Sequence, residues 1–309
     1  MIQIENLCKT YQQVPAVNNL NLQIEPGSVF GFIGPNGSGK TTTMQILATL
    51  LKPSSGKAWV GGYDVQTEAE EVRRMIGYMP DFFGVYDYLT VMEYMEFYGA
   101  CYQIEPSQSR KVAKELLELV KLSEKQNHYV DELSRGMQQR LGLARCLIHD
   151  PKVLILDEPA SGLDPRARIE FREILKKLQQ MGKTIMISSH ILPELADLCD
   201  TIGVIEAGKL VTSGAVSDML VPKNQARTLE VHVLEEVKEA EELLQQSEYV
   251  QSIRVEKNCL YVKFTGDSTK QVQLVQQLAK ANVPVLQIFE SKLNIEDVFM
   301  KVTDKEGNS

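Results

Sequence analysis

The pattern of hydrophobic and polar positions changes along the chain, and its first part is typical of strands. In residues 1–65 short apolar runs alternate with turn signals. Further runs at 153–156 and 184–187, like the one at 29–33, are almost entirely apolar. Such runs are typical of strands buried on both faces of a parallel sheet. The sequence therefore predicts an α/β domain built on a parallel sheet.

The middle of the chain has the spacing of amphipathic helices. From about residue 89 to 149 apolar residues such as Val91, Met95 and Tyr98 recur at steps of three and four. This spacing predicts a largely helical insertion, with bounds of about 82–150. We also expect a polar helix at 66–75 and a helix at 165–181 that Gly182 ends.

The pattern changes again near residue 222, where a second domain is predicted to begin. The following segments read in the order β-α-β-β-α-β, which is that of a ferredoxin-like α+β unit. We therefore expect a large domain over 1–222, an accessory domain over 223–303 and a disordered tail over 304–309. The elements expected in the accessory domain lie at 228–233, 235–246, 250–255, 259–264, 268–281 and 285–289, with a short helix at 294–302.

Composition narrows the possible partners and compartments. The 309-residue chain has a formal net charge of −8, which argues against nucleic acid as a main partner, because phosphate backbones recruit basic surfaces. No apolar run reaches the length of a membrane span, and the first residues do not read as a secretory signal. The five cysteines are scattered without C-x-x-C pairs, so we expect buried thiols in a reducing compartment rather than disulfides or a zinc cluster.

A glycine-rich segment follows the run at 29–33 and leads into a predicted helix. It fits the phosphate-binding pattern G-x-x-x-x-G-K-[ST] in the strand–loop–helix setting that this pattern requires. Its glycines allow a tight turn that directs N–H groups at phosphate oxygens, and the helix dipole favours the same anion. Lys40 adds a charge near the terminal phosphates, and the Thr41 hydroxyl suits Mg²⁺. The residues expected to bind the nucleotide here are Gly34, Pro35, Asn36, Gly37, Ser38, Gly39, Lys40, Thr41 and Thr42.

Two carboxylates, Asp157 and Glu158, follow the apolar run at 153–156. At a strand tip beside the phosphate loop, Asp157 can hold Mg²⁺ directly or through water. Glu158 projects differently and is placed to orient or deprotonate the attacking water. An isolated Asp-Glu pair is more often a solvated strand end, but the apolar strand before it and the segment 159–164 after it favour catalysis.

The segment Leu-Ser-Arg-Gly-Met-Gln-Gln-Arg at 133–140 resembles the signature of ATP-binding cassette (ABC) ATPases, and it precedes the Asp157-Glu158 strand as in that family. Ser134 can cap a helix that begins near Arg135, which exposes N–H groups to an anion. The resemblance implies a P-loop ABC cassette that hydrolyses ATP with Mg²⁺. It further implies that Ser134, Arg135 and Gly136 contact ATP held by a second cassette, in a homodimer or a heterodimer.

Three further segments resemble parts of the same family. Residues 161–164 resemble the loop that connects the two active sites of a dimer, and His190 resembles the switch histidine that contacts the γ-phosphate and water. Tyr11 resembles the aromatic residue that stacks on adenine, although a lone tyrosine is usually a packing residue. The other histidines, His128, His149 and His232, have no such setting and are expected to be surface or packing residues.

Asp81 departs from the family pattern. The segment 76–80 normally leads to a glutamine that senses Mg²⁺ and the attacking water, whereas this chain has an aspartate. A carboxylate is still a hard oxygen ligand, but it adds charge and lacks the amide donor. We therefore expect Asp81 to be a working but retuned sensor in both the catalytic and the metal site. The signature also has Arg135 and Met137 where glycine and glutamine are commonest, and this is not expected to abolish activity.

The resemblance also implies what the ATPase drives. Residues 223–303, with Ile-Glu-Asp-Val-Phe at 295–299, look like the accessory domain of exporters of the drug- and bacteriocin-resistance (ABC-2) type; alternatively this domain only packs against the cassette or stabilises a dimer. The implied partners are integral membrane permease subunits, which would hold the chain in the cytoplasm at the inner face of the membrane.

Apolar side chains follow the sensor segment, namely Phe82, Phe83, Val85, Tyr86 and Tyr88. They could line a groove that receives a permease helix, or they could be buried inside the helical insertion. A different class of function is a soluble ABC ATPase that acts on ribosomes or DNA. The single phosphate loop, the absence of a sustained heptad pattern and the acidic balance disfavour it.

Overall fold

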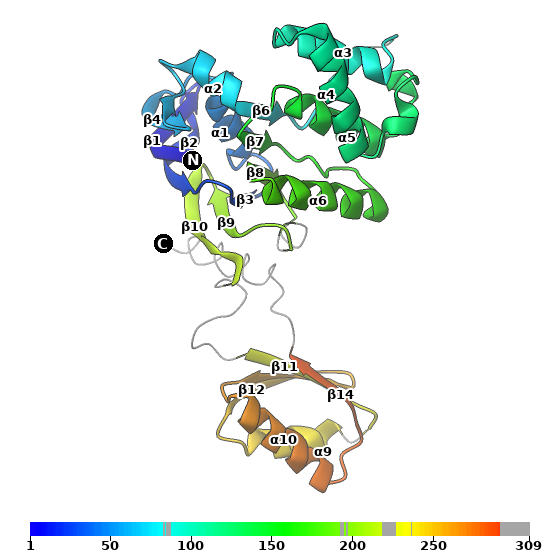
Figure 1. Ribbon diagram of the computed structural model, residues 1–309. Coiled ribbons are helices and arrows are strands. Elements are labelled where there is room, and N and C mark those ends of the chain that lie inside the picture. The colour runs from blue at the N-terminus through cyan, green and yellow to red at the C-terminus, as the bar shows by residue number, and fades with distance from the viewer. Residues whose placement is uncertain are drawn as a thin grey trace. The chain divides into compact units, whose positions relative to one another are not determined.

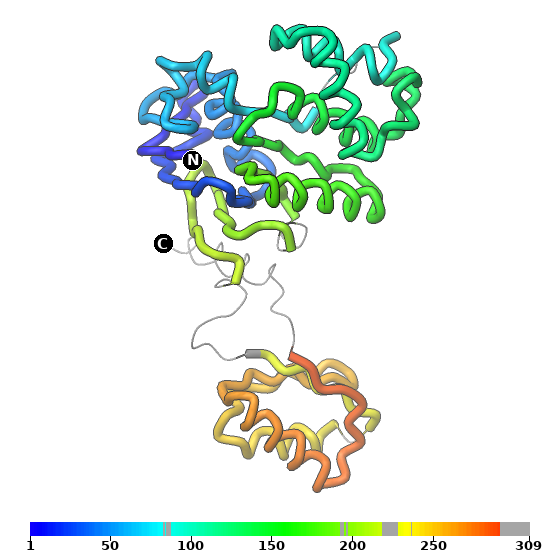
Figure 2. Tube along the Cα trace, in the orientation of Figure 1, coloured from blue at the N-terminus to red at the C-terminus, as the bar shows by residue number. Residues whose placement is uncertain are grey.

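The computed structural model describes residues 1–82, 84, 88–191, 195, 197–217, 227–235 and 237–290. Contacts divide the chain into two compact units, Met1–Val216 and Ser217–Ser309 (Figures 1 and 2). The predicted boundary near 222 lies outside the described residues. Each unit has a hydrophobic core of its own and is described by itself.

The first unit contains an antiparallel sheet and a mainly parallel one. The antiparallel sheet has the strand order β2-β1-β4-β5, with β1 at Ile2–Tyr11, β2 at Val14–Ile24, β4 at Ser55–Val60 and β5 at Tyr63–Asp64. Alternation of buried and exposed residues along β1 and β2 indicates that one face of this sheet meets the core.

The second sheet of this unit has the order β10-β9-β3-β8-β7-β6, and only β10 pairs antiparallel. Every residue of β3, β7 and β8 is buried, which explains the unbroken apolar runs in the sequence. The strands are β3 at Val29–Ile33, β6 at Ile76–Met79, β7 at Val153–Leu156, β8 at Thr184–Ser189, β9 at Thr201–Glu206 and β10 at Lys209–Ala215.

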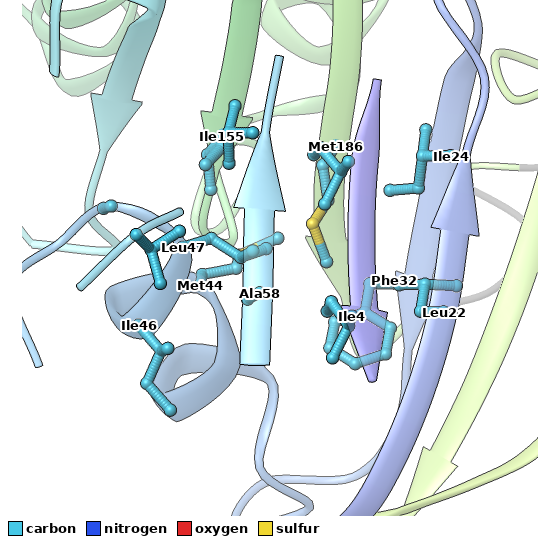
Figure 3. Packing of buried hydrophobic residues seen from close by; sticks show 14 of the residues in the cluster. Ile4, Leu22, Ile24, Phe32, Met44, Ile46, Leu47, Ala58, Ile155 and Met186 are labelled. Atoms are coloured by element: carbon cyan, nitrogen blue, oxygen red, sulfur yellow. The ribbon is translucent and has the colours of Figure 1, made fainter. Parts of the chain in front are cut away.

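Helix α1, Lys40–Leu47, contributes to the main core of the first unit. Figure 3 shows Met44 of this helix beside Ala58 of β4. Residues of β1, β2, β3, β7 and β8 belong to the same cluster. Met44, Ile46 and Leu47 are all fully buried. Because these side chains are packed into the core, the position of α1 is fixed, and so is that of the loop that precedes it.

Polar caps begin most helices of the first unit. Thr90 and Glu93 form a reciprocal capping box, and Asp164 accepts a hydrogen bond from Ala167 N at 2.9 Å. The predicted helix at 66–75 starts later, because the Asp64 carboxylate holds the N–H groups of residues 66 and 67 in a turn. None of the helices in the described ranges has the length and apolar character to cross a bilayer. The helices are α2 at Ala69–Met75, α3 at Val91–Cys101, α4 at Pro106–Leu119, α5 at Arg135–Leu147 and α6 at Pro165–Gln180, with 3-10 turns at Ser123–Lys125 and Val130–Glu132.

The second unit is an antiparallel sheet of order β12-β13-β11-β14 with both helices packed on one face. Strands β11 and β12, which a helix connects, flank β13, so this is a split β-α-β arrangement of the ferredoxin-like kind. The predicted helix at 294–302, the motif at 295–299 and the tail at 304–309 lie outside the described residues. The elements are β11 at Arg227–Val233, α9 at Val237–Gln245, β12 at Val250–Glu256, β13 at Cys259–Phe264, α10 at Ser268–Lys280 and β14 at Val285–Glu290.

All five cysteines are free thiols. Cys146, Cys199 and Cys259 are buried, as expected for small apolar side chains, whereas Cys8 is half-buried. Cys101 is exposed, contrary to the expectation that all five are buried. It is the last residue of α3 and is not among the buried residues of that helix.

Candidate functional site

Four parallel strands bring the candidate chemistry to one edge of their sheet. The phosphate loop follows β3, Asp81 comes shortly after β6, Asp157 and Glu158 follow β7, and His190 follows β8. Because β3, β8, β7 and β6 run parallel and adjacent, their carboxyl ends meet at the same edge. Ligands bind at this edge in open α/β sheets.

The phosphate loop adopts a conformation that requires glycine at two positions. Gly37 and Gly39 have φ of 81° and 105°, in the left-handed region that other residues rarely adopt. A Cβ on Gly39 would also lie 2.3 Å from the carbonyl oxygen of Ala16. The loop therefore passes close to β2 and curls directly into α1, whose first residue is Lys40.

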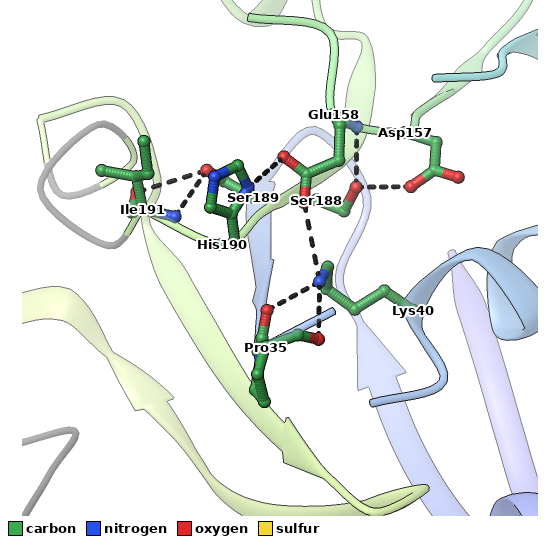
Figure 4. A network of polar contacts seen from close by, with 9 residues as sticks. Pro35, Lys40, Asp157, Glu158, Ser188, Ser189, His190 and Ile191 are labelled. Carbon is green, nitrogen blue, oxygen red and sulfur yellow. Dashed lines mark hydrogen bonds and ion pairs between the residues drawn. The ribbon is translucent and has the colours of Figure 1, made fainter. Parts of the chain in front are cut away.

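Lys40 lies inside this loop, with only 6% of its side chain exposed. Its Nζ donates to the carbonyl oxygens of Gly34 at 2.6 Å and Pro35 at 3.2 Å (Figure 4). The same nitrogen lies 3.5 Å from Glu158 Oε1. A nearly buried ammonium with acceptors on both sides is fixed in place. Its positive charge can attract an anion bound in the loop.

A hydroxyl that the motifs did not single out joins the two carboxylate residues. Ser188 Oγ donates to Asp157 Oδ1 at 2.7 Å and accepts from Glu158 N at 2.8 Å (Figure 4). Ser188 and Asp157 are 1% and 0% exposed. Ser188 therefore fixes the orientation of one carboxylate and the backbone of the next. A polar pair, Ser188-Ser189, at the end of a buried apolar strand is the signal that could have revealed it.

Glu158 occupies a position that is held against local strain. Its φ of 47° is in the left-handed region, which is costly for a residue with a Cβ and is often found at functional sites. Its Oε2 lies 2.9 Å from His190 Nδ1, while Oε1 faces Lys40 (Figure 4). The carboxylate thus lies between a fixed ammonium and an imidazole. A carboxylate held in this way can act as a general base.

The charge on Asp157 is controlled by opposing effects. Burial raises the pKa of its carboxyl, and the hydrogen bond from Ser188 and the nearby Thr41 hydroxyl lower the pKa. The nearby carboxylates of Asp81 and Glu158 raise this pKa further. Asp157 Oδ2 is buried and has no hydrogen-bond partner among the described residues. A hydroxyl and carboxylates gathered around an unsatisfied oxygen form the hard donor set that suits Mg²⁺.

A cavity of about 290 Å³ lies in front of these groups. It contains most of the predicted nucleotide-binding residues together with Ala16, which no sequence signal had suggested. Gly34, Pro35, Asp157 and His190 are not among the residues that line it. The lining residues are Ala16, Asn36, Gly37, Ser38, Gly39, Lys40, Thr41, Thr42, Asp81 and Glu158.

The signature segment lies outside this cavity. Ser134 caps α5, as predicted, by accepting from Met137 N at 3.4 Å, and both Ser134 and Arg135 are exposed. The Arg135 guanidinium lies against Gly162, where an added Cβ would be 2.5 Å from its central carbon. The signature and the 161–164 loop are therefore packed together as one surface, with a capped helix N-terminus that is accessible to another molecule.

The predicted aromatic residue and two of the other histidines have different settings. Tyr11 is 45% exposed, with Lys9 Nζ 5.3 Å from its ring centroid, and it is not among the residues that line the cavity. His128 is exposed beside Lys125. His149 stacks on Tyr102 at 3.8 Å and its Nε2 lies 2.9 Å from Ile76 O, so it is a packing residue as expected.

Comparisons with known proteins agree on one family. The family described as "ABC transporter" matches residues 17–161. The chain is 33% identical to Nod factor export ATP-binding protein I of Rhizobium etli over 305 residues, which is 99% of this chain and 94% of that protein. It is 35% identical to linearmycin resistance ATP-binding protein LnrL of Bacillus subtilis, over 71% of this chain and 70% of that protein.

Solved structures give the same result for the first unit. The dimeric ATP-binding cassette MJ0796, in a post-hydrolysis state bound to ADP and Pi, superposes with a TM-score of 0.64 and 29% identity. That match covers 70% of this chain and 99% of the other. CbiO1 from Clostridium perfringens, part of the ABC transporter complex cbiONQ, has a TM-score of 0.65 and 27% identity, covering 72% and 91% of the two chains.

Proposed function

Since the chain belongs to the family of ABC transporter ATP-binding proteins, we propose that it powers export through separate membrane subunits by closing on ATP as a dimer. It is an ATP-binding and ATP-hydrolysing subunit of a transporter, with a P-loop α/β cassette. The proposal concerns the roles of individual residues, the partners and the direction of transport.

The observation that carries the proposal is the position of Glu158 at the wall of the phosphate cavity, between Lys40 and His190. The loop N–H groups and Lys40 would bind the β- and γ-phosphates of ATP. Glu158 would take a proton from the attacking water, and His190 would hold the carboxylate toward that water. The charge of Lys40, shared with the γ-phosphate, would offset the developing negative charge.

The residues present fit a magnesium ion that accompanies ATP. Thr41, Asp157 and Asp81 supply the oxygen donors, and the unsatisfied Asp157 Oδ2 supports this assignment. A bound Mg²⁺ would offset part of the negative charge on the phosphates of ATP. Ser188 would keep the Asp157 carboxylate turned toward the ion.

The nucleotide would be completed by a second cassette. Ser134, Arg135 and Gly136 lie outside the cavity of their own chain, on an exposed helix N-terminus that suits the γ-phosphate of a partner's ATP. The 161–164 loop, packed against Arg135, would sense the partner across the interface. Tyr11 would stack on adenine from the exposed end of β1. The dimeric state of the MJ0796 cassette supports this arrangement.

Two substitutions separate binding from turnover. Lys40→Ala removes the ammonium in the loop, so we expect ATP affinity to fall about tenfold to a hundredfold. Glu158→Gln keeps the shape of the base but not its charge, so we expect unchanged binding and a turnover reduced about 10²- to 10⁴-fold. Fluorescent-nucleotide titration and phosphate release measure the two effects. Glu173→Gln, an exposed carboxylate on α6, is the matched control. Wild-type turnover in Glu158→Gln would contradict the proposed base.

The permease would dock near the sensor segment. Phe82 and Tyr88 are 86% and 87% exposed, which favours the groove over burial inside the helical insertion for these two residues. Phe83, Val85 and Tyr86 lie outside the described residues. Relatives named for Nod factor export and linearmycin resistance support an export role at the inner face of the membrane, with the second unit as an accessory domain.

A co-purification experiment tests this partner. When a candidate permease is co-expressed, Phe82→Asp should reduce recovery of the membrane subunit, because a charge is placed in an apolar contact. Leu50→Asp changes a residue that is also apolar and 65% exposed but lies elsewhere, so it should not reduce recovery. Undiminished association with Phe82→Asp would count against docking at this segment.

A further inference from the structure

One face of the second unit's sheet carries side chains that can bind metal. On β11, Leu229, Val231 and Val233 are buried in the core beneath α9 and α10. Because side chains alternate along a strand, Glu230 and His232 project from the opposite face. The register of β11 with β13 pairs His232 with Cys259, so Cys259 lies on that same face. In Figure 1 the two helices lie on the other side of this sheet.

The three donor atoms lie close together. Cys259 Sγ is 3.4 Å from His232 Nε2, and the same nitrogen is 3.6 Å from Glu230 Oε2. All three donors lie within 4.8 Å of one another. Ligand atoms around a tetrahedral zinc ion, with bonds of about 2.0 to 2.3 Å, are separated by roughly 3.5 Å. Two of the three separations therefore already match a shared ion.

A purely hydrogen-bonded cluster explains this geometry less well. The thiol and the carboxylate both approach Nε2, and one ring nitrogen makes only one hydrogen bond along its in-plane direction. A metal ion among the three donors would satisfy all of them at once. The ring of His232 is also held in place, because it stacks on Phe289 of β14 at 5.5 Å with an interplanar angle of 20°.

Exposure of the cluster is suited to a bound ion with one open position. Cys259 is 8% exposed, while the side chains of Glu230 and His232 are 19% and 38% exposed. Arg254, which the strand register places on this face, is paired with Glu256. A divalent ion can therefore reach the donors from solvent without displacing a core side chain.

We propose that Glu230, His232 and Cys259 bind one divalent transition-metal ion of the zinc class, with water as a fourth ligand. Mixed sulfur, nitrogen and oxygen ligands favour such ions over Mg²⁺, which prefers oxygen alone. The site is therefore chemically distinct from the nucleotide site and does not depend on the proposed transport function. No local motif such as C-x-x-C indicates this site in the sequence, because its residues come together only through the register of β11 with β13.

Cobalt provides the probe. The full-length protein, treated with a chelator and kept free of nucleotide, is titrated with Co²⁺ and followed by absorption. We expect one equivalent to produce a thiolate-to-cobalt charge-transfer band that Zn²⁺ then removes, because zinc binds more tightly. The nucleotide cavity has no cysteine in its lining, so Co²⁺ bound there would not give this band. Absence of the band would overturn the proposal.

Variants assign the ligands. Cys259→Ser should abolish the charge-transfer band, and His232→Gln and Glu230→Gln should weaken Co²⁺ binding by at least about tenfold. Cys101→Ser, which changes the exposed cysteine, should leave the titration unchanged. Zn²⁺ should raise the melting temperature of the wild type but not of Cys259→Ser. His232 is partly exposed, so its variant tests the site even if a change at the buried Cys259 disturbs folding. A band that persists in Cys259→Ser, or wild-type affinity in His232→Gln, would contradict the assignment.

Discussion

The edge of the parallel sheet in the first unit and the open face of the antiparallel sheet in the second gather polar side chains in different ways. At the edge, Asp157 and Ser188 are almost completely buried and hold each other through hydrogen bonds. On the face, His232 and Glu230 are partly exposed, and strand register brings them to Cys259. The side chains at the parallel-sheet edge are held in place by burial and hydrogen bonds. Those on the antiparallel face are brought together by strand pairing.

This difference has consequences for substitution. A buried polar network loses more than one contact when a member is removed, because the remaining groups lie away from water. The partly exposed side chains of Glu230 and His232 remain in reach of water, so a change at either removes only that metal ligand. We therefore expect changes at the parallel-sheet edge to affect turnover strongly and changes at Glu230 or His232 to leave ATP hydrolysis intact.

The largest effect in this comparison is expected for Ser188→Ala. It removes both the donor to Asp157 and the acceptor for Glu158 N, so turnover should fall about tenfold to a hundredfold with little change in ATP affinity. Steady-state phosphate release and nucleotide titration check this. Ser109→Ala changes a buried serine in the helical insertion and should leave turnover unchanged. Equal rates for Ser188→Ala and the wild type would remove the case for preorganisation.

A smaller effect is expected for Asp81→Gln. Asp81 lines the cavity but is exposed, so water screens its charge. Glutamine keeps an oxygen ligand and removes a negative charge. The Mg²⁺ concentration for half-maximal turnover should therefore rise, by at most about tenfold. ATP hydrolysis measured across Mg²⁺ concentrations tests this. Identical curves for the two proteins would refute a tuning role.

The smallest effect on turnover is expected for His149→Gln, because His149 is a half-buried residue outside the candidate site. Burial lowers the pKa of His149 below its ordinary value, and the contact with Ile76 O opposes this. The folded state therefore binds fewer protons than the unfolded state, and this contribution to stability is lost as the pH falls from about 6.5. The free energy of unfolding should fall less steeply with acid in His149→Gln, with turnover unchanged. Parallel pH profiles for the two proteins would contradict this.

Much of the first unit could be predicted because its chemistry is contiguous in sequence. Apolar runs such as 153–156 are buried on both faces of the sheet, and Ser134 caps its helix at the expected residue. The phosphate loop and the carboxylates each read as a local pattern beside a strand. The resemblance to ABC ATPases covers these same segments, and the comparisons confirm the family.

Other features depend on contacts between distant segments. Ala16 lines the nucleotide cavity because β2 passes close to Gly39, and no local pattern indicates this. The left-handed backbone at position 158 would suggest glycine from conformation alone, yet a glutamate occupies it. His232 and Cys259, 27 residues apart, meet only through strand pairing. Such features depend on how segments far apart in the sequence are arranged in the fold, which the local spacing of apolar residues does not specify.

The central claim is that two cassettes enclose ATP between the phosphate loop of one and the Ser134 turn of the other. Solution scattering of Glu158→Gln, saturated with Mg-ATP at high protein concentration and with any related cassette subunit supplied, tests it most directly. With ATP we expect a particle of twice the mass of a single cassette subunit. With ADP we expect the mass of a single subunit. Adding Ser134→Arg should abolish the dimer. Single particles in saturating Mg-ATP would contradict the account.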